Sequence, residues 1–312
     1  MDALKNHFIA RCNSLDFEHI TDHPNILIAA AFWEEERYQA AITCYKMMRT
    51  IDDLVDNYKS EHPIITLQEK EQLMTEVNKW LGEIEEQSSD NAMVQEVSQT
   101  FQRFGIPVWT MRAFAQAMIY DIKHDGFPSL QTFLTYAEGA SVAPASIFVH
   151  LAGLRKKDNI YLPPLFDVRE AANSCAVFSY LVHIMRDFIK DQRNNLMYYA
   201  DDLMQKHGLN RDMLQQMSHG DPLCQGFRNM MADYCEIAEQ YRIKTHDTLQ
   251  RIKPLMEPAS QLSLDIIFNL YLMVYERIDC KKGTFSTKEL NPTAAEIKKR
   301  VLETIQKNNF IN

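Results

Sequence analysis

The feature that most constrains this chain is an acidic stripe within a largely apolar stretch, residues 45–56. On a helix, Tyr45, Arg49, Asp52 and Asp56 fall on one face, because their spacing follows the helical turn. Asp52 and Asp56 are like charges one turn apart, and their repulsion grows when water is removed. Arg49 supplies one opposite charge, and a bound divalent metal would supply more. The stretch therefore predicts a buried helix with a polar seam.

The same pattern recurs in residues 180–191. Its stripe carries a phenol, an imidazole and two carboxylates, and an arginine precedes the first carboxylate: Tyr180, His183, Asp187, Asp191 and Arg186. Two such helices facing each other can hold Mg²⁺, which prefers carboxylate oxygens and bridges them to phosphates. A solvated acidic face is the alternative for either stretch alone, and the recurrence favours a paired site. Asp52→Asn or Asp187→Asn should relieve repulsion and leave metal-free stability unchanged or higher.

Composition excludes several classes of protein. The chain has 312 residues, with 46% hydrophobic and 24% charged residues, as expected of a globular protein. Its net charge of −9 gives no support for nucleic-acid binding. The six cysteines form no CxxC or zinc spacing, so we expect reduced, mostly buried thiols of a cytoplasmic protein. The first residues do not resemble a signal peptide, and no apolar run reaches the length of a membrane span.

Nearly every segment has helical periodicity, which predicts an all-α fold. Asp22-His23-Pro24 is typical of a helix start, and the helical region that follows runs to about Tyr58 and ends at His62-Pro63. Thr66 and Glu69 form a capping box for the next helix. Residues 155–166 are expected to be a loop, and residues 180–191 are expected to lie on one helix. We find no strand pattern, repeat or domain boundary, so residues 1–312 are predicted to form a single domain.

Residues 129–153 are rich in small side chains, and Pro144 should kink this segment. Small residues allow close approach of a ligand or of another backbone, and tight helix packing is the simpler interpretation. Other active-site patterns are absent from the sequence: Glu-x-x-His pairs of di-iron proteins, phosphate-binding glycine loops and the GxSxG elbow. His183 is distinctive among the histidines because it lies one turn before Asp187. Neighbouring carboxylates should raise the pKa of His183, and bound metal should oppose that shift.

The two acidic stretches resemble the motifs of the squalene/phytoene synthase family of head-to-head prenyl transferases. Residues 45–56 match the first motif, Y-x-x-x-R-x-x-D-D-x-x-D, and residues 186–191 match the second, R-D-x-x-x-D. The resemblance extends from about residue 23 to residue 280. Other matching features are an arginine before the first motif, a mid-chain tyrosine, an aromatic residue after the second motif and a C-terminal helix: Arg37, Tyr136, Tyr198 and Tyr271.

The resemblance implies an isoprenoid-synthase-type bundle with a central cavity between two Asp-rich helices. It implies a Mg²⁺ site formed by five carboxylates: Asp52, Asp53, Asp56, Asp187 and Asp191. All of these except Asp53 are expected to be catalytic. It also implies contacts with prenyl diphosphates from the other motif side chains: Tyr45, Arg49, Tyr136, Tyr180, His183, Arg186, Tyr198 and Tyr271. Arg49 and Arg186 are expected to place positive charge at the leaving diphosphate.

The implied reaction joins two farnesyl or two geranylgeranyl diphosphates through a cyclopropylcarbinyl diphosphate. Rearrangement would give a squalene-, dehydrosqualene- or phytoene-like product. NADPH would be needed for squalene, and no residue pattern indicates a nicotinamide site. Release of so apolar a product would suit contact with a membrane surface.

Several positions depart from the family pattern and keep alternatives open. Tyr180 and His183 stand where the family usually has Gln and Asn, and Asn195-Leu196 replaces Gly-Arg. A related enzyme that ionises a single prenyl diphosphate is one alternative. A non-enzymatic relative, such as an assembly factor or lipid carrier, is another, although such a protein has no evident need for clustered carboxylates.

Overall fold

The computed structural model describes residues 2–20, 25–62, 64–158 and 160–310. Most of these residues are helical, which confirms the predicted all-α class. The predicted helix start at Asp22-His23-Pro24 lies outside the described residues, as does Pro63. Within the described residues, no helix is both long enough and apolar enough to cross a bilayer.

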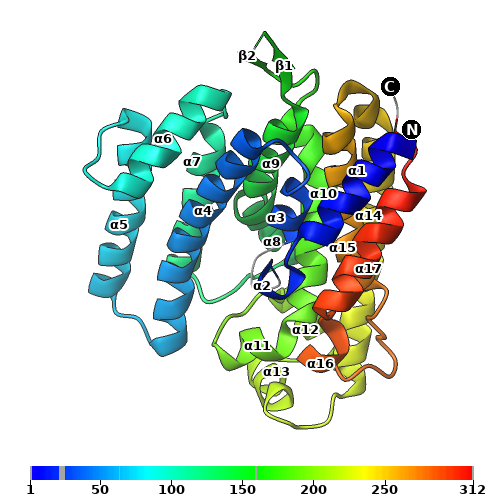
Figure 1. The fold of residues 1–312 in the computed structure, drawn as a ribbon. Coiled ribbons are helices and arrows are strands. Elements are labelled where there is room, and N and C mark those ends of the chain that lie inside the picture. Colours follow the sequence, from blue (N-terminus) through cyan, green and yellow to red (C-terminus); the bar gives the residue numbers. More distant parts are fainter. Residues whose placement is uncertain (1, 21–24, 63, 159, 311–312) are drawn as a thin grey trace.

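The N-terminal half contains short helices followed by longer ones (Figure 1). In chain order these are α1 (Asp2–Ser14), α2 (Phe17–Ile20), α3 (Asn25–Ala30), α4 (Glu35–Glu61), α5 (Leu67–Glu86), α6 (Ala92–Phe104), α7 (Trp109–Lys123), α8 (Leu130–Ala137), the π-helix η1 (Glu138–Val142) and α9 (Ala143–Gly153). Helices α4 to α7 lie on one side of the molecule in Figure 1. The predicted capping box is confirmed, because Thr66 accepts from the Glu69 backbone and Glu69 accepts from the Thr66 backbone.

The C-terminal half contains the central helix of the fold, α10, which is visible as the long green helix in Figure 1. The elements are β1 (Arg155–Lys157), β2 (Ile160–Leu162), α10 (Val168–Arg186), α11 (Phe188–Arg193), α12 (Asp201–Lys206), α13 (Arg211–Ser218), α14 (Gln225–Ile252), the 3₁₀-helix η2 (Lys253–Leu255), α15 (Pro258–Tyr275), α16 (Thr287–Leu290) and α17 (Ala294–Lys307). Helix α10 packs on α14, α9 and α15.

Two sequence predictions need correction. The region from α3 to α4 is two helices, because the chain turns at residues 31–34 and a new helix begins at Glu35 with acidic residues in its first turn. The predicted loop at residues 155–166 contains an antiparallel hairpin, in which Lys156 pairs with Tyr161. The Lys156 ammonium lies 5.2 Å from the Tyr161 ring centroid. Such cross-strand contacts stabilise a hairpin that is too short to show alternation in the sequence.

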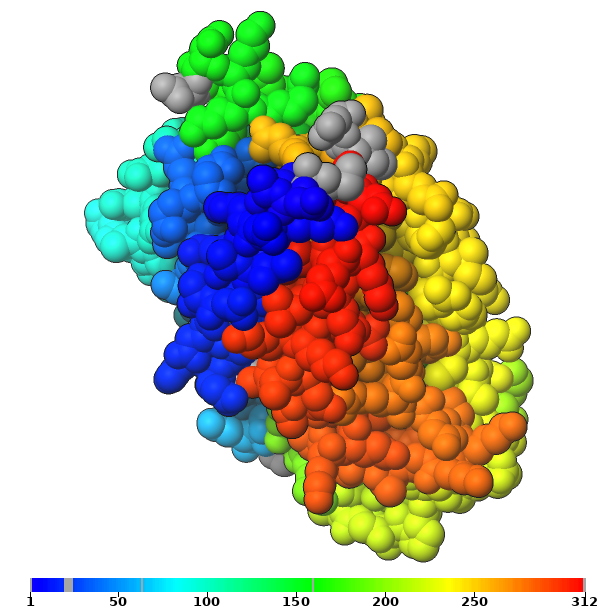
Figure 2. Space-filling view, turned by 45° about the vertical axis from the view of Figure 1, so that its right-hand side comes forward, coloured from blue at the N-terminus to red at the C-terminus, as the bar shows by residue number. Residues whose placement is uncertain are grey.

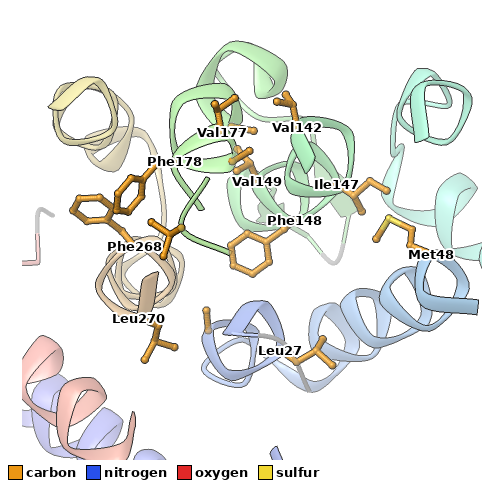
Figure 3. Packing of buried hydrophobic residues seen from close by; sticks show 14 of the residues in the cluster. Leu27, Met48, Val142, Ile147, Phe148, Val149, Val177, Phe178, Phe268 and Leu270 are labelled. Atoms are coloured by element: carbon orange, nitrogen blue, oxygen red, sulfur yellow. The ribbon is translucent and has the colours of Figure 1, made fainter. Parts of the chain in front are cut away.

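The core is formed where α9, α10 and α15 meet the N-terminal helices (Figure 3). Phe178 of α10 points toward Phe268 of α15, with ring centroids 5.8 Å apart. Phe148 projects from α9 toward α3 and α15 (Figure 3). Each of these rings is more than nine-tenths buried, so each contributes roughly 2–3 kcal/mol of hydrophobic stabilisation.

The two ends of the chain cover one face of the bundle. Figure 2 shows the N-terminal segment beside the C-terminal helix. Phe8 of α1 packs on Phe310, with ring centroids 5.4 Å apart, and the Lys5 ammonium donates to the Gln306 carbonyl at 2.8 Å. Helix α17 packs in turn on α15. The termini therefore support α15, which forms one wall of the internal cavity described next.

Candidate active site

A cavity of about 490 Å³ lies between α4 and α10, with further walls from α9, α14 and α15. Along α10 the lining changes from apolar, at Ala171 and Ala172, to acidic, at Asp187 just after the helix ends. Those ends are about sixteen residues apart, which corresponds to roughly 24 Å along a helix. The apolar lining also includes Phe148, Leu249, Ile252, Leu264 and Ile267. The cavity thus joins an acidic end to an apolar end.

The first acidic wall is formed by α4. Tyr45, Arg49, Asp52, Asp53 and Asp56 all line the cavity, as the helical stripe predicts. The Arg49 guanidinium donates to the Asp52 carboxylate at 3.1 Å and also pairs with Asp53. Burial and the neighbouring Asp56 raise the pKa of Asp52 to about 7. Burial and a third carboxylate, Asp121 of α7, raise the pKa of Asp56 to about 6. Arg49 therefore balances only part of the charge on this wall.

The second acidic wall differs from its predicted form. Helix α10 ends at Arg186, the chain turns at Asp187, and α11 begins at Phe188. The prediction of one helix through residues 180–191 is therefore wrong. At this break the backbone of Asp187 leaves the helical conformation, and the Arg186 guanidinium folds back onto the Asp187 carboxylate with two bonds of 2.7 Å. Tyr180, His183, Asp187 and Asp191 nevertheless all line the cavity, because Asp187 and Asp191 remain one turn apart.

The pKa values of Asp187 and Asp191 are shifted in opposite directions. Burial disfavours ionisation of Asp187, but hydrogen bonds from Arg186 and from His183, the latter at 2.8 Å, hold its pKa well below the usual range. Burial and the ionised Asp187 raise the pKa of Asp191 to about 8. Arg186 is absent from the residues that line the cavity among those described. Its guanidinium contacts Asp187, and its predicted contact with a leaving group stays a prediction.

The pKa of His183 is lowered, contrary to the expectation from its neighbours. Burial is the largest cause, and the positive charge of Arg186 adds to it, which together outweigh the attraction of Asp187. His183 is therefore the neutral donor to Asp187 at neutral pH in the metal-free chain.

Asp121 of α7 is a functional candidate that the motif pattern does not contain. Its carboxylate accepts from the Tyr136 hydroxyl in a short hydrogen bond, and the Lys59 ammonium lies 3.9 Å away. Lys59 also donates to the Asp121 carbonyl at 3.0 Å. Burial raises the pKa of Asp121 to about 6, although Lys59 opposes the shift. The sequence does hold a signal, because Asp121 falls in the buried register of α7 with Phe114.

Lys190 is a second residue that the sequence interpretation did not assign. It lies on α11 between Asp187 and Asp191 and lines the cavity. Its positive charge lowers the pKa of Asp52 on the opposite wall. Further polar lining residues outside the predicted set include Asn57 and Ser60 of α4 and Asn194, which directly follows α11.

Three tyrosines form a group beside the carboxylates, in which Tyr136 is buried and Tyr180 and Tyr198 are partly buried. The ring centroids of Tyr136 and Tyr180 are 6.3 Å apart, and those of Tyr180 and Tyr198 are 6.2 Å apart. Burial, together with nearby acidic groups, raises the pKa of all three well above its usual value, so the phenols stay neutral. Tyr45 and Tyr271 also line the cavity, so every predicted tyrosine reaches it.

The small-residue segment, residues 129–153, both lines the cavity and packs tightly on another helix. Ala140, Ser141, Pro144 and Ala145 line the cavity, whereas Gly139 faces α7. A side chain at Gly139 would collide with the Ala113 carbonyl, so tight packing requires glycine there. A π-helix, η1, ends at Val142, and Pro144 lies in the first turn of α9 that follows it. The kink expected at Pro144 stays a prediction.

The donor set suits Mg²⁺ bound together with a ligand. Among the residues that the structure describes, no three His, Cys, Asp or Glu groups lie close enough to form a metal site by themselves. The facing side chains are oxygen donors, and Mg²⁺ usually takes one or two carboxylates and fills its other positions with water and phosphate oxygens. Burial and neighbouring carboxylates raise the pKa values of Asp52, Asp56 and Asp191, and a bound cation would favour their ionised forms. The residues present therefore fit a phosphate-linked Mg²⁺ site.

Comparisons with known proteins agree with this architecture. The family model described as squalene/phytoene synthase matches residues 23–296. A dehydrosqualene synthase structure solved with a ligand has a TM-score of 0.67 at 14% identity, covering 98% of this chain and 99% of that chain. Squalene synthase HpnC from Alicyclobacillus acidocaldarius has a TM-score of 0.61 at 12% identity, covering 85% of this chain and 90% of that chain.

A third solved structure, YisP from Bacillus subtilis subsp. subtilis strain 168, has a TM-score of 0.60 at 17% identity and covers 95% of this chain and 96% of that chain. Among curated protein sequences, none matches this chain significantly. At these identities the solved structures show a shared fold, which confirms the predicted bundle of the isoprenoid-synthase type.

Proposed function

The chain belongs to the squalene/phytoene synthase family, and from this membership we propose that it joins two prenyl diphosphates head to head in a Mg²⁺-dependent reaction. The intermediate would be a cyclopropylcarbinyl diphosphate, and the product a squalene-, dehydrosqualene- or phytoene-like hydrocarbon. The observation that carries the proposal is the cavity itself, which joins an acidic end to an apolar end. A prenyl diphosphate has the same division, with a charged head and an apolar tail.

The carboxylates of both walls would hold Mg²⁺ at the acidic end. Asp52, Asp56 and Asp191 are the strongest candidates, because their pKa values are raised and a cation would keep them ionised. Asp187 is held by Arg186 and would contribute less. Asp53 shares Arg49 with Asp52 and would be a further ligand. When bound, Mg²⁺ would neutralise the diphosphate and make it a better leaving group.

Two cationic side chains would orient the diphosphate head. Arg49 lines the cavity from α4, and Lys190 lines it from α11 on the opposite wall. Fixed positive charge placed where negative charge develops lowers the barrier to departure of a leaving group. Arg186 would act indirectly, by keeping Asp187 ionised and in place.

The tyrosines and the apolar wall would protect cationic intermediates from water. Tyr136, Tyr180 and Tyr198 present neutral aromatic rings, whose faces attract cations without reacting as bases. Asp121 keeps the Tyr136 hydroxyl fixed and its proton on oxygen. Beyond the tyrosines, Phe148 and Leu264 supply an apolar surface for the prenyl tails.

The test is product analysis with farnesyl or geranylgeranyl diphosphate supplied alone, with Mg²⁺ and with or without NADPH. We expect an apolar product with twice the carbon count of the substrate, formed only when Mg²⁺ is present. Dependence on NADPH would identify the reductive route to squalene. A prenyl alcohol or single-prenyl hydrocarbon would instead support ionisation of one substrate. Binding without consumption of either diphosphate would support a non-enzymatic relative.

A further inference from the structure

A pair of thiols lies outside the cavity, between α14 and the turn that follows α15. Cys235 of α14 and Cys280 of the turn place their sulfur atoms 3.2 Å apart, and both residues are free and half-buried. Cys12 and Cys44, by contrast, are buried, with 0% and 2% of their surface exposed. The other four cysteines are half-buried, so the expectation that most thiols are buried is wrong.

Contacts on both sides of the pair hold the turn against α14. The Tyr275 hydroxyl, at the end of α15, donates to the Cys235 carbonyl at 3.1 Å. Beyond the thiols, the Arg228 guanidinium of α14 donates to the Gly283 carbonyl at 3.2 Å and to the Cys280 carbonyl at 3.5 Å. The two sulfur atoms are thus brought together by independent contacts that do not involve sulfur, and little rearrangement would be needed to join them.

The two thiols are chemically unequal. A hydrogen bond from the Cys235 thiol lowers the pKa of Cys280, although burial and Asp279 oppose that shift. The same hydrogen bond, together with burial, raises the pKa of Cys235. The lower pKa favours Cys280 as the attacking thiol and Cys235 as the resolving thiol.

We propose that Cys235 and Cys280 form a reversible disulfide by exchange with a small-molecule disulfide such as oxidised glutathione. The Cys280 thiolate attacks one sulfur of the oxidant, which forms a mixed disulfide and releases one glutathione thiol. The Cys235 thiol loses its proton and attacks the Cys280 sulfur, which forms the internal disulfide and releases the second glutathione thiol. Two electrons and two protons pass from the protein to the oxidant. The sulfur atoms close from 3.2 Å to about 2.05 Å.

The disulfide would join two walls of the cavity. Helix α14 contributes Leu249 and Ile252 to the lining, and α15 contributes Leu264 and Ile267. The bond links positions that are 45 residues apart, so it removes much conformational freedom from the unfolded chain. We therefore expect the oxidised chain to melt roughly 5 °C higher than the reduced chain. Amide hydrogen exchange in residues 276–286 should slow at the same time.

The experiment compares the full chain, reduced and after incubation with excess oxidised glutathione, by intact mass, peptide mapping and thermal melting. The expected result is the loss of two hydrogen atoms, a cross-linked peptide pair containing Cys235 and Cys280, and a higher melting temperature that dithiothreitol reverses. Cys235→Ser and Cys280→Ser should each abolish the cross-link and the shift. Cys224→Ser is the matched control, because Cys224 is also half-buried and immediately precedes α14.

Two outcomes would overturn the proposal. One is accumulation of glutathione mixed disulfides without an internal cross-link. The other is an equal melting shift in wild type, Cys235→Ser and Cys280→Ser, which would place the effect at other residues. Because none of these measurements uses prenyl diphosphates, their result is independent of the proposed enzymatic function.

Discussion

The two walls of the acidic cavity carry the same sequence pattern but differ in how their charge is balanced. On α4, the pKa values of Asp52 and Asp56 rise to about 7 and about 6, although Arg49 lies beside them. At the end of α10, Arg186 and His183 hold Asp187 ionised. Two motifs with the same pattern of carboxylates therefore need not have the same protonation state.

The difference has a geometric cause. Arg49 is half-exposed and divides its donors between Asp52 and Asp53, so neither carboxylate is fully paired. Arg186 is less exposed and gives a bidentate bond to one carboxylate, the strongest form of this pair. Asp52 and Asp56 on α4 are consequently incompletely paired, as is Asp191 on α11, whereas Asp187 is paired within the protein.

The largest expected effect comes from removing a carboxylate from the charge-deficient wall. Asp52→Asn should lower the rate of product formation from a prenyl diphosphate by roughly 10³-fold, because one Mg²⁺-holding oxygen is lost. The far-UV circular dichroism should not change. Asp247→Asn is the control, since Asp247 is exposed on α14. Activity retained in Asp52→Asn would remove the α4 wall from the chemistry.

The second effect is on the free energy of unfolding, which should respond differently to a substitution on each wall. Asp187→Asn should lower the metal-free free energy of unfolding by roughly 3 kcal/mol, because it breaks the pair with Arg186 and leaves a poorly paired, largely buried guanidinium. Asp52→Asn should leave this free energy unchanged or higher. The sequence alone predicts no loss in either variant. Denaturant unfolding of both chains without metal decides between the two views, and equal effects would contradict the comparison.

The third effect is on the pH dependence of folding stability, whose direction follows from the pKa shifts. Asp56, Asp52 and Asp191 have pKa values of about 6, 7 and 8 in the folded chain, above the usual value of 3.8. The folded state thus binds more protons than the unfolded state. The stability that these three carboxyl groups contribute is present below about pH 4 and is lost as pH rises through 6 to 8. Asp187, with its depressed pKa, contributes stability that is lost only as pH falls below its unfolded value.

The measurement is metal-free unfolding at pH 5, 6.5 and 8. Asp191→Asn should reduce the decline across this window by roughly 2 kcal/mol. Added Mg²⁺ with inorganic diphosphate should also reduce the decline. If the free energy of unfolding of the wild-type chain rises between pH 5 and pH 8, the carboxyl groups do not have the raised pKa values on which this prediction rests.

The smallest effect is expected at His183, where the family usually has Asn. His183→Asn should keep the rate within roughly tenfold of wild type, because a neutral amide can replace a neutral imidazole as donor to Asp187. The measurement is the steady-state rate with the substrate used for Asp52→Asn. A loss as large as that of Asp52→Asn would give His183 a role specific to this chain.

Much of this arrangement is predictable from the sequence, because helical stripes follow from residue spacing. The spacing places Tyr45, Asp52 and Asp56 on one face, and the structure confirms that they line one cavity. The capping box at Thr66 and the all-α class were predictable for the same reason, since each depends on local pattern. The roles of the site residues and the presence of Mg²⁺ stay predictions.

The rest depends on contacts between distant residues. The Tyr136 partner, Asp121, is fifteen residues away on another helix. The end of α10 at Arg186 interrupts a stripe whose spacing continues to Asp191, so periodicity cannot show it. The lowered pKa of His183 reflects burial, whereas the sequence displays only neighbouring charges. The β1–β2 hairpin is too short to produce a strand pattern.

The central claim is that the α4 wall lacks positive charge until Mg²⁺ and a diphosphate bind together. Isothermal titration of the metal-free chain with a non-reacting prenyl thiodiphosphate, with and without Mg²⁺, tests it directly. We predict tight binding only with Mg²⁺, and a loss of at least roughly 10²-fold in affinity in Asp52→Asn but not in Asp247→Asn. Equal binding without Mg²⁺, or unchanged binding in Asp52→Asn, would contradict the claim.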